Sequence, residues 1–501
     1  MSPSKDPPMF DIIVIGAGLS GINAAYRIQQ SLPHKSFAIL ESRAQIGGTW
    51  DFWKYPGART DSTMALFGFD WYPWTQSSNM ARAGDLRQYI EDAAVSEGID
   101  TRIRFRHRMT TASWSSAEQC WTLEVEVSHP DSPKETKTIK TSWLICATGY
   151  YSYDKALPAE IPGLDTFAGD VIHPQWWDDS VSHAGKRVVV IGSGATAITL
   201  VPALASSGVA SVTMLQRSPS YVFALAGRMP RYPWDRFLPA SWSYRLRWWM
   251  QMTMEVVFVG LLSTFPNFAR RFLQSEMRKK LPEGFDVATH FNPRYDVFQQ
   301  RLCFCPSADF FKALHRDNVS IVTDTISTVT PTGIKLTSGK VLEADIIITA
   351  TGLYLELLSG IQVFVDGTRF DRTIGSRYVW NNTMLDGLPN AGQITGYVAT
   401  TWTPGADVRT RQLIKVIRHM DRTGAVVATP WLDEKVRKSF PDTSAMPLTS
   451  TYAIQGRDRV PRSAFVGPWR SGVWWLSDLW NYWFGTVTQG VRYTYGKGKD
   501  D

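Results

Sequence analysis

The sequence of 501 residues has few cysteines, no long hydrophobic run and no concentrated block of charge. Four cysteines are too few for a disulfide framework, which predicts a reducing, cytoplasmic compartment. The most apolar stretch, residues 256–265, is far shorter than the roughly 20 residues that a membrane-spanning helix needs. The first residues, MSPSKDPPMF, lack the apolar core of a secretory signal. These absences predict a soluble protein, or one that associates peripherally with a membrane.

The net charge of +7 is spread along the chain and does not form a basic run interleaved with aromatic residues. We therefore expect no nucleic-acid partner. We expect the positive surplus to favour phosphorylated cofactors or an anionic membrane surface. The cysteines are Cys120, Cys146, Cys303 and Cys305, and the last two form a C-x-C pair. Because no second pair or histidine follows at ligand spacing, the pattern favours packed thiols and predicts no metal site.

Tryptophan is abundant, with 21 residues, and several of these lie in the stretch WWLSDLWNYWF at 474–484. The composition favours a packed C-terminal segment. Tryptophan also suits positions with one apolar and one wet side. The alternatives are therefore a patch at a membrane interface or an aromatic-lined substrate entrance.

A nucleotide-binding unit begins the chain. The apolar run FDIIVIG at 10–16 predicts a buried parallel strand that leads into a glycine motif, Gly16, Gly18 and Gly21, and then a helix. The glycines allow a tight turn, close approach of the backbone to a pyrophosphate and close packing of the helix. A second strand ends at Glu41, where a carboxylate accepts hydrogen bonds from a ribose and repels a 2′-phosphate. The first site is therefore predicted to bind FAD or NAD.

The same signature recurs in the middle of the chain. The strand RVVVI at 187–191 enters GSGATA at 192–197, in which Gly192, Gly194 and Thr196 are the predicted contacts with a nucleotide. The next strand ends in Arg217 and Ser218. Arg217 stands where the first unit has Glu41, and a guanidinium at that position fits a 2′-phosphate. The second site is therefore predicted to bind NADPH.

Two further strands end alike, SWLICATG at 142–149 and DIIITATG at 345–352, each after its own glycine motif. This internal repeat predicts an α/β fold with two Rossmann-like dinucleotide-binding domains. Residues 228–299 interrupt the second unit. Their apolar residues recur at helical spacing among several arginines, which predicts a helical insertion over the active site. Core packing is one interpretation of that pattern, and a basic amphipathic surface that touches membrane is another.

Residues 167–178, FAGDVIHPQWWD, lie between the two glycine motifs and match the pattern F-x-G-x-x-x-H-x-x-x-W-[P/D] at every fixed position. This pattern is the fingerprint of type I Baeyer–Villiger monooxygenases, which the sequence resembles over nearly its whole length. It is most similar to the ethionamide-activating branch, through stretches such as VVIGSGATA at 189–197 and QRLC at 300–303. The residues that match the fingerprint are Phe167, Gly169, His173, Trp177 and Asp178.

The resemblance implies that NADPH reduces FAD and that a flavin C4a-peroxide, formed with O₂, inserts oxygen into a ketone to give an ester or lactone. The same species would oxygenate sulfides or thioamides. Such chemistry needs a fixed positive charge in a dry pocket. By resemblance Arg301 supplies that charge and Asp61 orients it, Gly48, Thr49 and Trp50 contact the flavin cofactor, and His173 acts in domain movement.

The resemblance also divides the chain. It implies an FAD-binding domain that begins in 9–150, then a linker with the fingerprint and the first part of an NADP-binding domain in 151–227. The helical insertion follows in 228–299, the rest of the NADP-binding domain in 300–352, and the rest of the FAD-binding domain, with the substrate pocket, in 353–501. Two positions depart from the family pattern. Gln300 stands where longer relatives have a lysine, and Gly405 stands where close relatives have one.

Alternatives remain at this stage. One is an N- or S-hydroxylating flavin monooxygenase without Baeyer–Villiger activity, and another is a non-enzymatic, nucleotide-binding redox sensor. A disulfide reductase is disfavoured, because no cysteine precedes Cys120 and a redox pair would be needed near the first unit.

Overall fold

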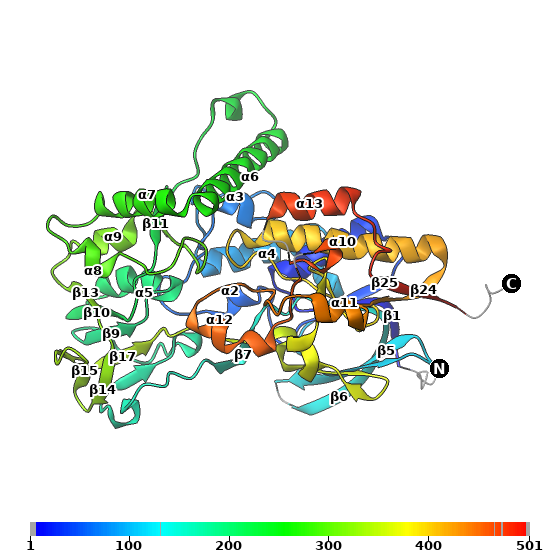
Figure 1. The fold of residues 1–501 in the computed structure, drawn as a ribbon, viewed down its shortest axis with the longest axis horizontal. Coiled ribbons are helices and arrows are strands. Elements are labelled where there is room, and N and C mark those ends of the chain that lie inside the picture. Colours follow the sequence, from blue (N-terminus) through cyan, green and yellow to red (C-terminus); the bar gives the residue numbers. More distant parts are fainter. Residues whose placement is uncertain (1–6, 131, 465, 472–473, 497–501) are drawn as a thin grey trace.

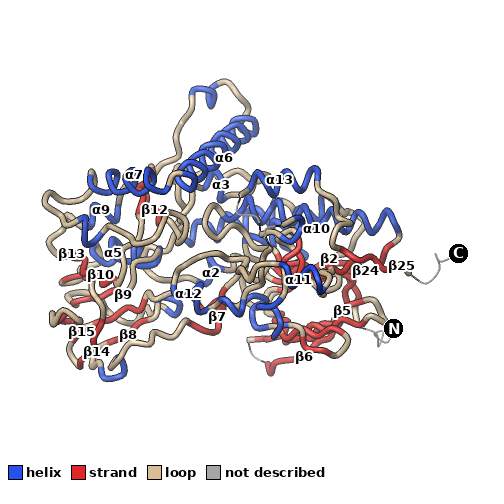
Figure 2. Tube along the Cα trace, in the orientation of Figure 1, coloured by secondary structure: helices blue, strands red, loops and turns tan. Residues whose placement is uncertain are grey.

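Two sheets with mainly parallel strands organise the chain (Figure 1). The computed structural model describes residues 7–130, 132–464, 466–471 and 474–496. Figure 2 shows the two sets of strands in separate parts of the molecule, each accompanied by helices. The fold is therefore α/β with two Rossmann-like units, as the repeated glycine motifs predict.

The first sheet has the order β20-β19-β4-β5-β6-β1-β2-β3, and β23 pairs additionally with β6. The long strand β6 is antiparallel to β5 in its first part and parallel to β1 in its last part. The bounds are β1 Met9–Ile15, β2 Phe37–Leu40, β3 Ile103–Arg104, β4 His107–Ser115, β5 Cys120–His129, β6 Ser132–Cys146, β19 Gln362–Val365, β20 Thr368–Arg369 and β23 Ala391–Gln393.

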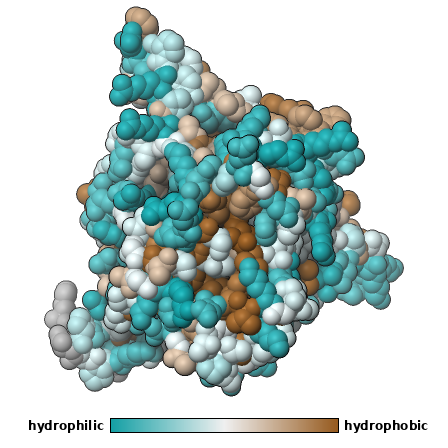
Figure 3. Space-filling model, turned by 90° about the vertical axis from the view of Figure 1, so that its left-hand side faces the viewer, coloured by the Kyte–Doolittle hydropathy of each residue, from teal (hydrophilic) through white to brown (hydrophobic). Residues whose placement is uncertain are grey.

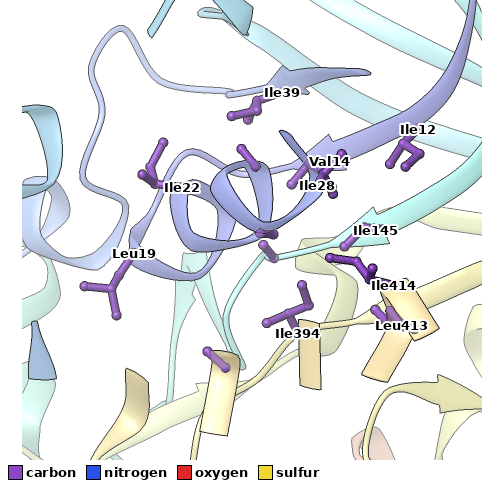
Figure 4. Close-up of a cluster of buried hydrophobic side chains, with 14 of the residues drawn as sticks. Ile12, Val14, Leu19, Ile22, Ile28, Ile39, Ile145, Ile394, Leu413 and Ile414 are labelled. Carbon is purple, nitrogen blue, oxygen red and sulfur yellow. The ribbon is translucent and has the colours of Figure 1, made fainter. Parts of the chain in front are cut away.

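The apolar run in β1 is buried on both faces. Ile12 and Val14 belong to one hydrophobic cluster and Ile13 and Ile15 to another. Because successive side chains of a strand point to opposite faces, such burial requires an unbroken apolar run. Helix α1 (Leu19–Ser31) covers one face, and helix α10 (Trp402–Thr423) packs against it from the far end of the chain (Figure 4). The core of the first unit therefore joins residues almost 400 positions apart.

The second sheet has the order β13-β10-β9-β17-β8, with every pair parallel. The bounds are β8 Asp170–Ile172, β9 Arg187–Ile191, β10 Ser211–Gln216, β13 Val319–Thr323 and β17 Ile346–Thr349. Helix α5 (Ala195–Ala205) begins within the second glycine motif, directly after Gly194. A small antiparallel sheet of β14 (Ile326–Thr330), β15 (Gly333–Leu336) and β16 (Val341–Glu343) covers the opposite face, because Val189 and Ile334 share a cluster.

Two short strands connect the units. Strand β7 (Tyr151–Ala156) follows the first Ala-Thr-Gly sequence and β18 (Leu353–Leu355) follows the second. They pair with each other in an antiparallel ribbon. Both crossings between the units therefore run side by side.

Residues 228–299 form helices α6 (Ala240–Thr264), α7 (Pro266–Arg278) and α8 (Val287–His290). Strands β11 (Val222–Leu225) and β12 (Cys303–Pro306) flank these helices and pair with each other, so the chain returns to the place it left. Helix α6 projects beyond the rest of the molecule (Figure 1). No single described helix is long and apolar enough to cross a membrane. Together α6 and α7 reach that length and composition, but they are bent by 114° where they meet.

Helix α13 (Trp475–Phe484) corrects one expectation. The tryptophan-rich stretch was expected to be packed, but no residue of α13 is buried, and Trp480 and Trp483 are 65% and 56% exposed. Its polar face is the inner one, where Asp478 accepts a hydrogen bond from Tyr397. The apolar face is therefore directed outward.

Candidate cofactor and substrate site

A cavity of about 840 Å³ lies between the two sheets and reaches both glycine motifs. Most of the predicted site residues line it, although they are spread over almost 300 residues of sequence. They are Gly16, Gly18, Glu41, Gly48, Thr49, Trp50, Asp61, His173, Gly192, Gly194, Thr196, Arg217, Ser218 and Arg301.

The first glycine motif leaves room for a phosphate. A Cβ atom at Gly21 would lie 1.8 Å from the carbonyl oxygen of Gly16, and Gly16 itself has a φ of +99°. A Cβ at Gly48 would lie 3.0 Å from Cα of Gly18. A side chain at Gly21 would push α1 away from the end of β1. A side chain at Gly48 would narrow the space in front of α1, whose first N–H groups and dipole favour an anion. These features fit a dinucleotide.

Glu41 follows β2 and is buried beside this motif. Its carboxylate accepts hydrogen bonds from the backbone N–H of Ala17 at 2.7 Å and of Arg43 at 2.8 Å. Burial raises the pKa of Glu41 above its ordinary value, and the two hydrogen bonds oppose that shift. The carboxylate oxygens keep further lone pairs that can accept hydrogen bonds from a ribose.

The second motif repeats this geometry. Gly192 has a φ of +136°, and a Cβ there would lie 2.3 Å from the carbonyl oxygen of Ala350. The third position is Ala197, which is buried. Arg217 lies exposed at the end of β10, and its guanidinium donates to the Thr451 hydroxyl at 2.9 Å. Its remaining N–H groups can bind a phosphate at the rim of the cavity.

Arg301 lies farther inside, near the first unit. Its Nε donates to the carbonyl oxygen of Val398 at 2.7 Å, and its Nη1 lies 3.5 Å from Oδ2 of Asp61. The side chain is 31% exposed and that of Asp61 is 32% exposed. Burial alone would lower the pKa of Arg301, but Tyr150, Asp61 and other nearby groups raise it above its ordinary value. Arg301 therefore stays charged in a mostly enclosed place.

Tyrosines surround this cation. Burial raises the pKa of Tyr150 to about 12, and it also raises the pKa of Tyr55 to about 12. Both residues line the cavity, as does Tyr452. The hydroxyl groups of Tyr150 and Tyr55 therefore stay neutral near neutral pH. Burial likewise raises the pKa of Cys303 to about 12, so this thiol is a packed neutral group.

His173 is the one fingerprint residue that lines the cavity. Its Nδ1 accepts a hydrogen bond from the backbone N–H of Gln175 at 3.1 Å, while Nε2 is buried without a hydrogen-bond partner among the described residues. Burial lowers the pKa of His173, which favours the neutral ring. The role in domain movement that the resemblance implies stays a prediction.

The other fingerprint residues lie outside the cavity lining. A Cβ at Gly169 would lie 2.3 Å from the carbonyl oxygen of Asp345, so this glycine lets β8 approach β17. Phe167 packs against the hydrophobic cluster that contains Ile347 of β17. Trp177 stacks on His183 with ring centroids 5.1 Å apart. Asp178 accepts hydrogen bonds from the backbone and side chain of Ser180. These contacts organise the segment between residues 167 and 183.

A second, smaller cavity of about 150 Å³ adjoins the first, because Tyr150 and Thr400 line both. Val398, which holds Arg301, also lines it. The other walls are mostly apolar and come from distant segments: Val259, Phe298, Leu357, Met384, Tyr397, Met446, Leu448 and Trp474. This space suits an apolar molecule whose polar end points toward Arg301.

Several lining residues carry no separate prediction. Tyr150 directly follows the first Ala-Thr-Gly sequence, which is the signal that could have identified it. Thr451 and Tyr452 come from α12 (Thr451–Gln455), which has no recognisable motif. Gln300 lines the large cavity, whereas Gly405 lines neither cavity and packs in the first turn of α10 against Tyr397.

Comparisons with known proteins agree with this arrangement. The family described as pyridine nucleotide-disulphide oxidoreductase matches residues 10–229. The chain is 42% identical over 471 residues to the FAD-containing monooxygenase EthA of Mycolicibacterium smegmatis, covering 94% of each chain. It is 39% identical to the putative FAD-containing monooxygenase MymA of Mycobacterium tuberculosis, covering 92% of each.

Solved structures share the fold. An oxidized steroid monooxygenase bound to NADP superposes with a TM-score of 0.75 at 21% identity, covering 97% of this chain and all of that one. A polycyclic ketone monooxygenase from Thermothelomyces thermophila gives 0.76 at 18% identity, covering 99% of this chain and 91% of the other.

Proposed function

The chain belongs to the family of FAD-containing monooxygenases, and from that premise we propose that it uses FAD, NADPH and O₂ to insert one oxygen atom into an apolar ketone, giving an ester or lactone. Sulfides and thioamides are further substrates under this proposal. FAD, when bound and reduced, supplies the activation of O₂. The protein supplies binding, orientation, a fixed positive charge and exclusion of water.

One observation carries the proposal: Arg301 stands where the large cavity meets the apolar one, held by Val398 and Asp61. A ketone in the small cavity can point its oxygen toward this guanidinium. Negative charge that develops on that oxygen is then stabilised by a cation whose orientation is fixed before the reaction. Asp61 limits the orientations of Arg301, and the neutral Tyr150 hydroxyl can donate a hydrogen bond without bringing a competing charge.

The two motifs favour different nucleotides. Glu41 suits a ribose without a 2′-phosphate, so FAD belongs beside α1. Arg217 suits a 2′-phosphate, so NADPH belongs beside α5. Both places open into one cavity, which lets the two cofactors meet near Arg301.

The test replaces Arg301 in the FAD-loaded enzyme. Arg301→Ala is expected to lower the rate of ester formation from a ketone by roughly 10²–10³-fold, the usual effect of removing one oxyanion donor. The assay follows incorporation of ¹⁸O from ¹⁸O₂ by mass spectrometry, and flavin absorbance shows that FAD is still bound. Arg316→Ala, which changes an exposed arginine, is the control and is expected to retain the parent rate.

Ester formation by Arg301→Ala at the parent rate would contradict the role of the cation. Sulfoxide without any ester from the parent enzyme would identify a sulfur-oxygenating monooxygenase without Baeyer–Villiger activity. Absence of labelled product from every ketone and sulfide would favour the redox-sensor alternative.

A further inference from the structure

Helix α6 carries apolar side chains on its outer face as well as its inner one. Large residues recur at helical spacing along the outer face and continue into the start of α7. They are Trp242 (64% exposed), Leu246, Trp249 (51%), Val257, Leu261, Phe265 and Phe268. The inner face is fixed separately, because Tyr244, Met252, Val259 and Leu262 are buried. Packing within the chain therefore leaves the outer stripe uncovered.

Helix α13 presents a similar stripe formed by Leu476, Trp480, Trp483 and Phe484, which are 52–67% exposed. The two helices meet at Trp475, whose ring lies 5.5 Å from that of Trp248 and 5.6 Å from that of Trp249. Figure 1 shows α6, α7 and α13 along one edge of the molecule. We call the outer stripe of α6 with the start of α7, together with the stripe of α13, the α6/α13 surface.

The part of the insertion that carries this surface is strongly basic. Residues 228–280 contain ten arginines and lysines but only three carboxylates. Each carboxylate is engaged within the protein: Asp235 with Arg247, Glu255 with Thr401, and Glu276 with two lysines. Arg231, Arg236, Arg245 and Arg271 are exposed. The rim of the apolar stripe is therefore positive.

We propose that the α6/α13 surface docks on an anionic lipid bilayer. Exposed tryptophans flanked by arginines suit the boundary between acyl chains and headgroups. A bilayer can also reach this surface, because α6 projects from the body of the molecule (Figure 1), and the same projection stands at the top of the space-filling view (Figure 3). A second copy of the chain would present the same positive charges, which disfavours self-association through this face.

The docked surface would place the small cavity beside the lipid. Val259 and Ser263 of α6 line that cavity, and so does Trp474, which precedes α13 and is 36% exposed. Apolar substrates dissolved in the bilayer would then reach Arg301 between the two helices. This route rests on the proposed function, whereas docking itself does not.

The first test measures flotation of the FAD-loaded full chain with vesicles, without substrate. Vesicles of phosphatidylglycerol and phosphatidylcholine should retain the protein, and vesicles of phosphatidylcholine alone should retain it less. The double variant Trp249→Ser/Trp480→Ser is expected to lower the partition coefficient by roughly tenfold or more, because two interfacial rings are lost. Trp431→Ser, which removes a 45% exposed tryptophan elsewhere, is the matched control.

A second test changes the charge of the surface. Arg245→Glu/Arg271→Glu should weaken binding to the anionic vesicles but not the weaker binding to neutral ones, and 1 M salt should reduce the difference. Failure of the parent protein to bind anionic vesicles would overturn the proposal. So would a parent dimer that the tryptophan double variant converts to monomer without lipid, since the surface would then serve a second copy.

A last measurement separates docking from catalysis. The tryptophan double variant should oxidise a short, water-soluble ketone at the parent rate, but a long-chain ketone held in anionic vesicles at a rate reduced by about the loss in binding. Equal rates with the vesicle-bound ketone would overturn the route. If the parent enzyme oxidised neither ketone, the proposed function would fail while the flotation result still decided docking.

Discussion

Glu41 and Arg217 follow corresponding strands of the two repeats, yet they differ in charge and burial. Glu41 is 4% exposed and accepts hydrogen bonds from the backbone of its own motif. Arg217 lies at the exposed rim, where it donates a hydrogen bond to Thr451. A buried anion selects against a 2′-phosphate, whereas a cation at the rim can adjust to one.

This contrast predicts the effect of Arg217→Ala. The KM for NADPH should rise roughly 10- to 100-fold, because one or two charge-assisted hydrogen bonds to a phosphate are lost. The KM for NADH should change little. Steady-state kinetics with both coenzymes check this, with the exposed Arg372→Ala as control. An equal rise for both coenzymes would mean that Arg217 does not read the phosphate.

For individual residues, the sequence predicted a role in the site where the residue belongs to a recognisable motif. The glycines, Glu41 and Arg217 have local signals, and the structure places all of them except Gly21 in the lining of one cavity. The prediction that Arg301 lies near Asp61 came from the family resemblance, because the spacing of two residues so far apart in the sequence does not indicate that they are in contact. Tyr452 enters from a segment without any motif, so only the folded chain reveals it.

The position of helix α1 depends on its close approach to the end of β1 at Gly21. Gly21→Ala would place a methyl group 1.8 Å from the Gly16 carbonyl oxygen, and neither backbone segment can move without opening the motif. We expect a loss of roughly 3 kcal/mol in the free energy of unfolding, with FAD no longer retained on purification.

The control is Gly84→Ala in α4 (Ala83–Ser96), where nothing lies within 4 Å of the added atom. It should be neutral or stabilise by up to about 1 kcal/mol. Urea unfolding and the flavin-to-protein absorbance ratio check both variants. A Gly21→Ala protein that kept its FAD and parent stability would show that the close approach is dispensable.

Strands β9 and β17 are joined at their start by Arg187 and Asp345. The Asp345 carboxylate accepts from the Arg187 backbone N–H and from its guanidinium, both at 2.8 Å. These hydrogen bonds lower the pKa of Asp345 from 3.8 to about 2. A carboxyl whose pKa is lowered on folding stabilises the native state above its unfolded pKa, and this contribution disappears as the pH falls through its folded pKa.

Asp345→Asn should therefore lower Tm at pH 7, and the difference from the parent should shrink as the pH falls from 3.8 to about 2. Thermal unfolding followed by circular dichroism over this range checks the expectation. Asp317→Asn, at an exposed position away from these strands, should show a much smaller effect at pH 7. A difference for Asp345→Asn that did not depend on pH would attribute the effect to packing.

Element types were predictable where both flanks carried signals, as in the strand–glycine–helix units. The sequence did not predict which face of α13 is turned toward the protein. Its apolar and polar residues alternate with helical spacing, and such a pattern shows that a helix has two faces without showing which one meets the protein. The hydrogen bond between Tyr397 and Asp478 decides this, because it turns the polar face inward.

Across the whole molecule, one cavity borders both sheets. Removal of FAD is therefore expected to lower Tm. Addition of FAD at 100 times its Kd should raise the free energy of unfolding of the FAD-free protein by about 2.7 kcal/mol. Hydrogen exchange should locate the protection in β1, β2 and α1, and addition of NADP⁺ should extend it to β9 and α5. Protection by FAD confined to the second unit would contradict the assignment of the two nucleotides.

The interleaving of the first unit has a consequence for biosynthesis. All strands of the second sheet lie between residues 170 and 349, whereas the first sheet also needs β19 and β23, which end at residue 393. During synthesis on the ribosome, the first unit therefore cannot complete its sheet until the second unit has emerged. The nascent N-terminal strands must wait, partly unpaired, through the synthesis of about half the chain.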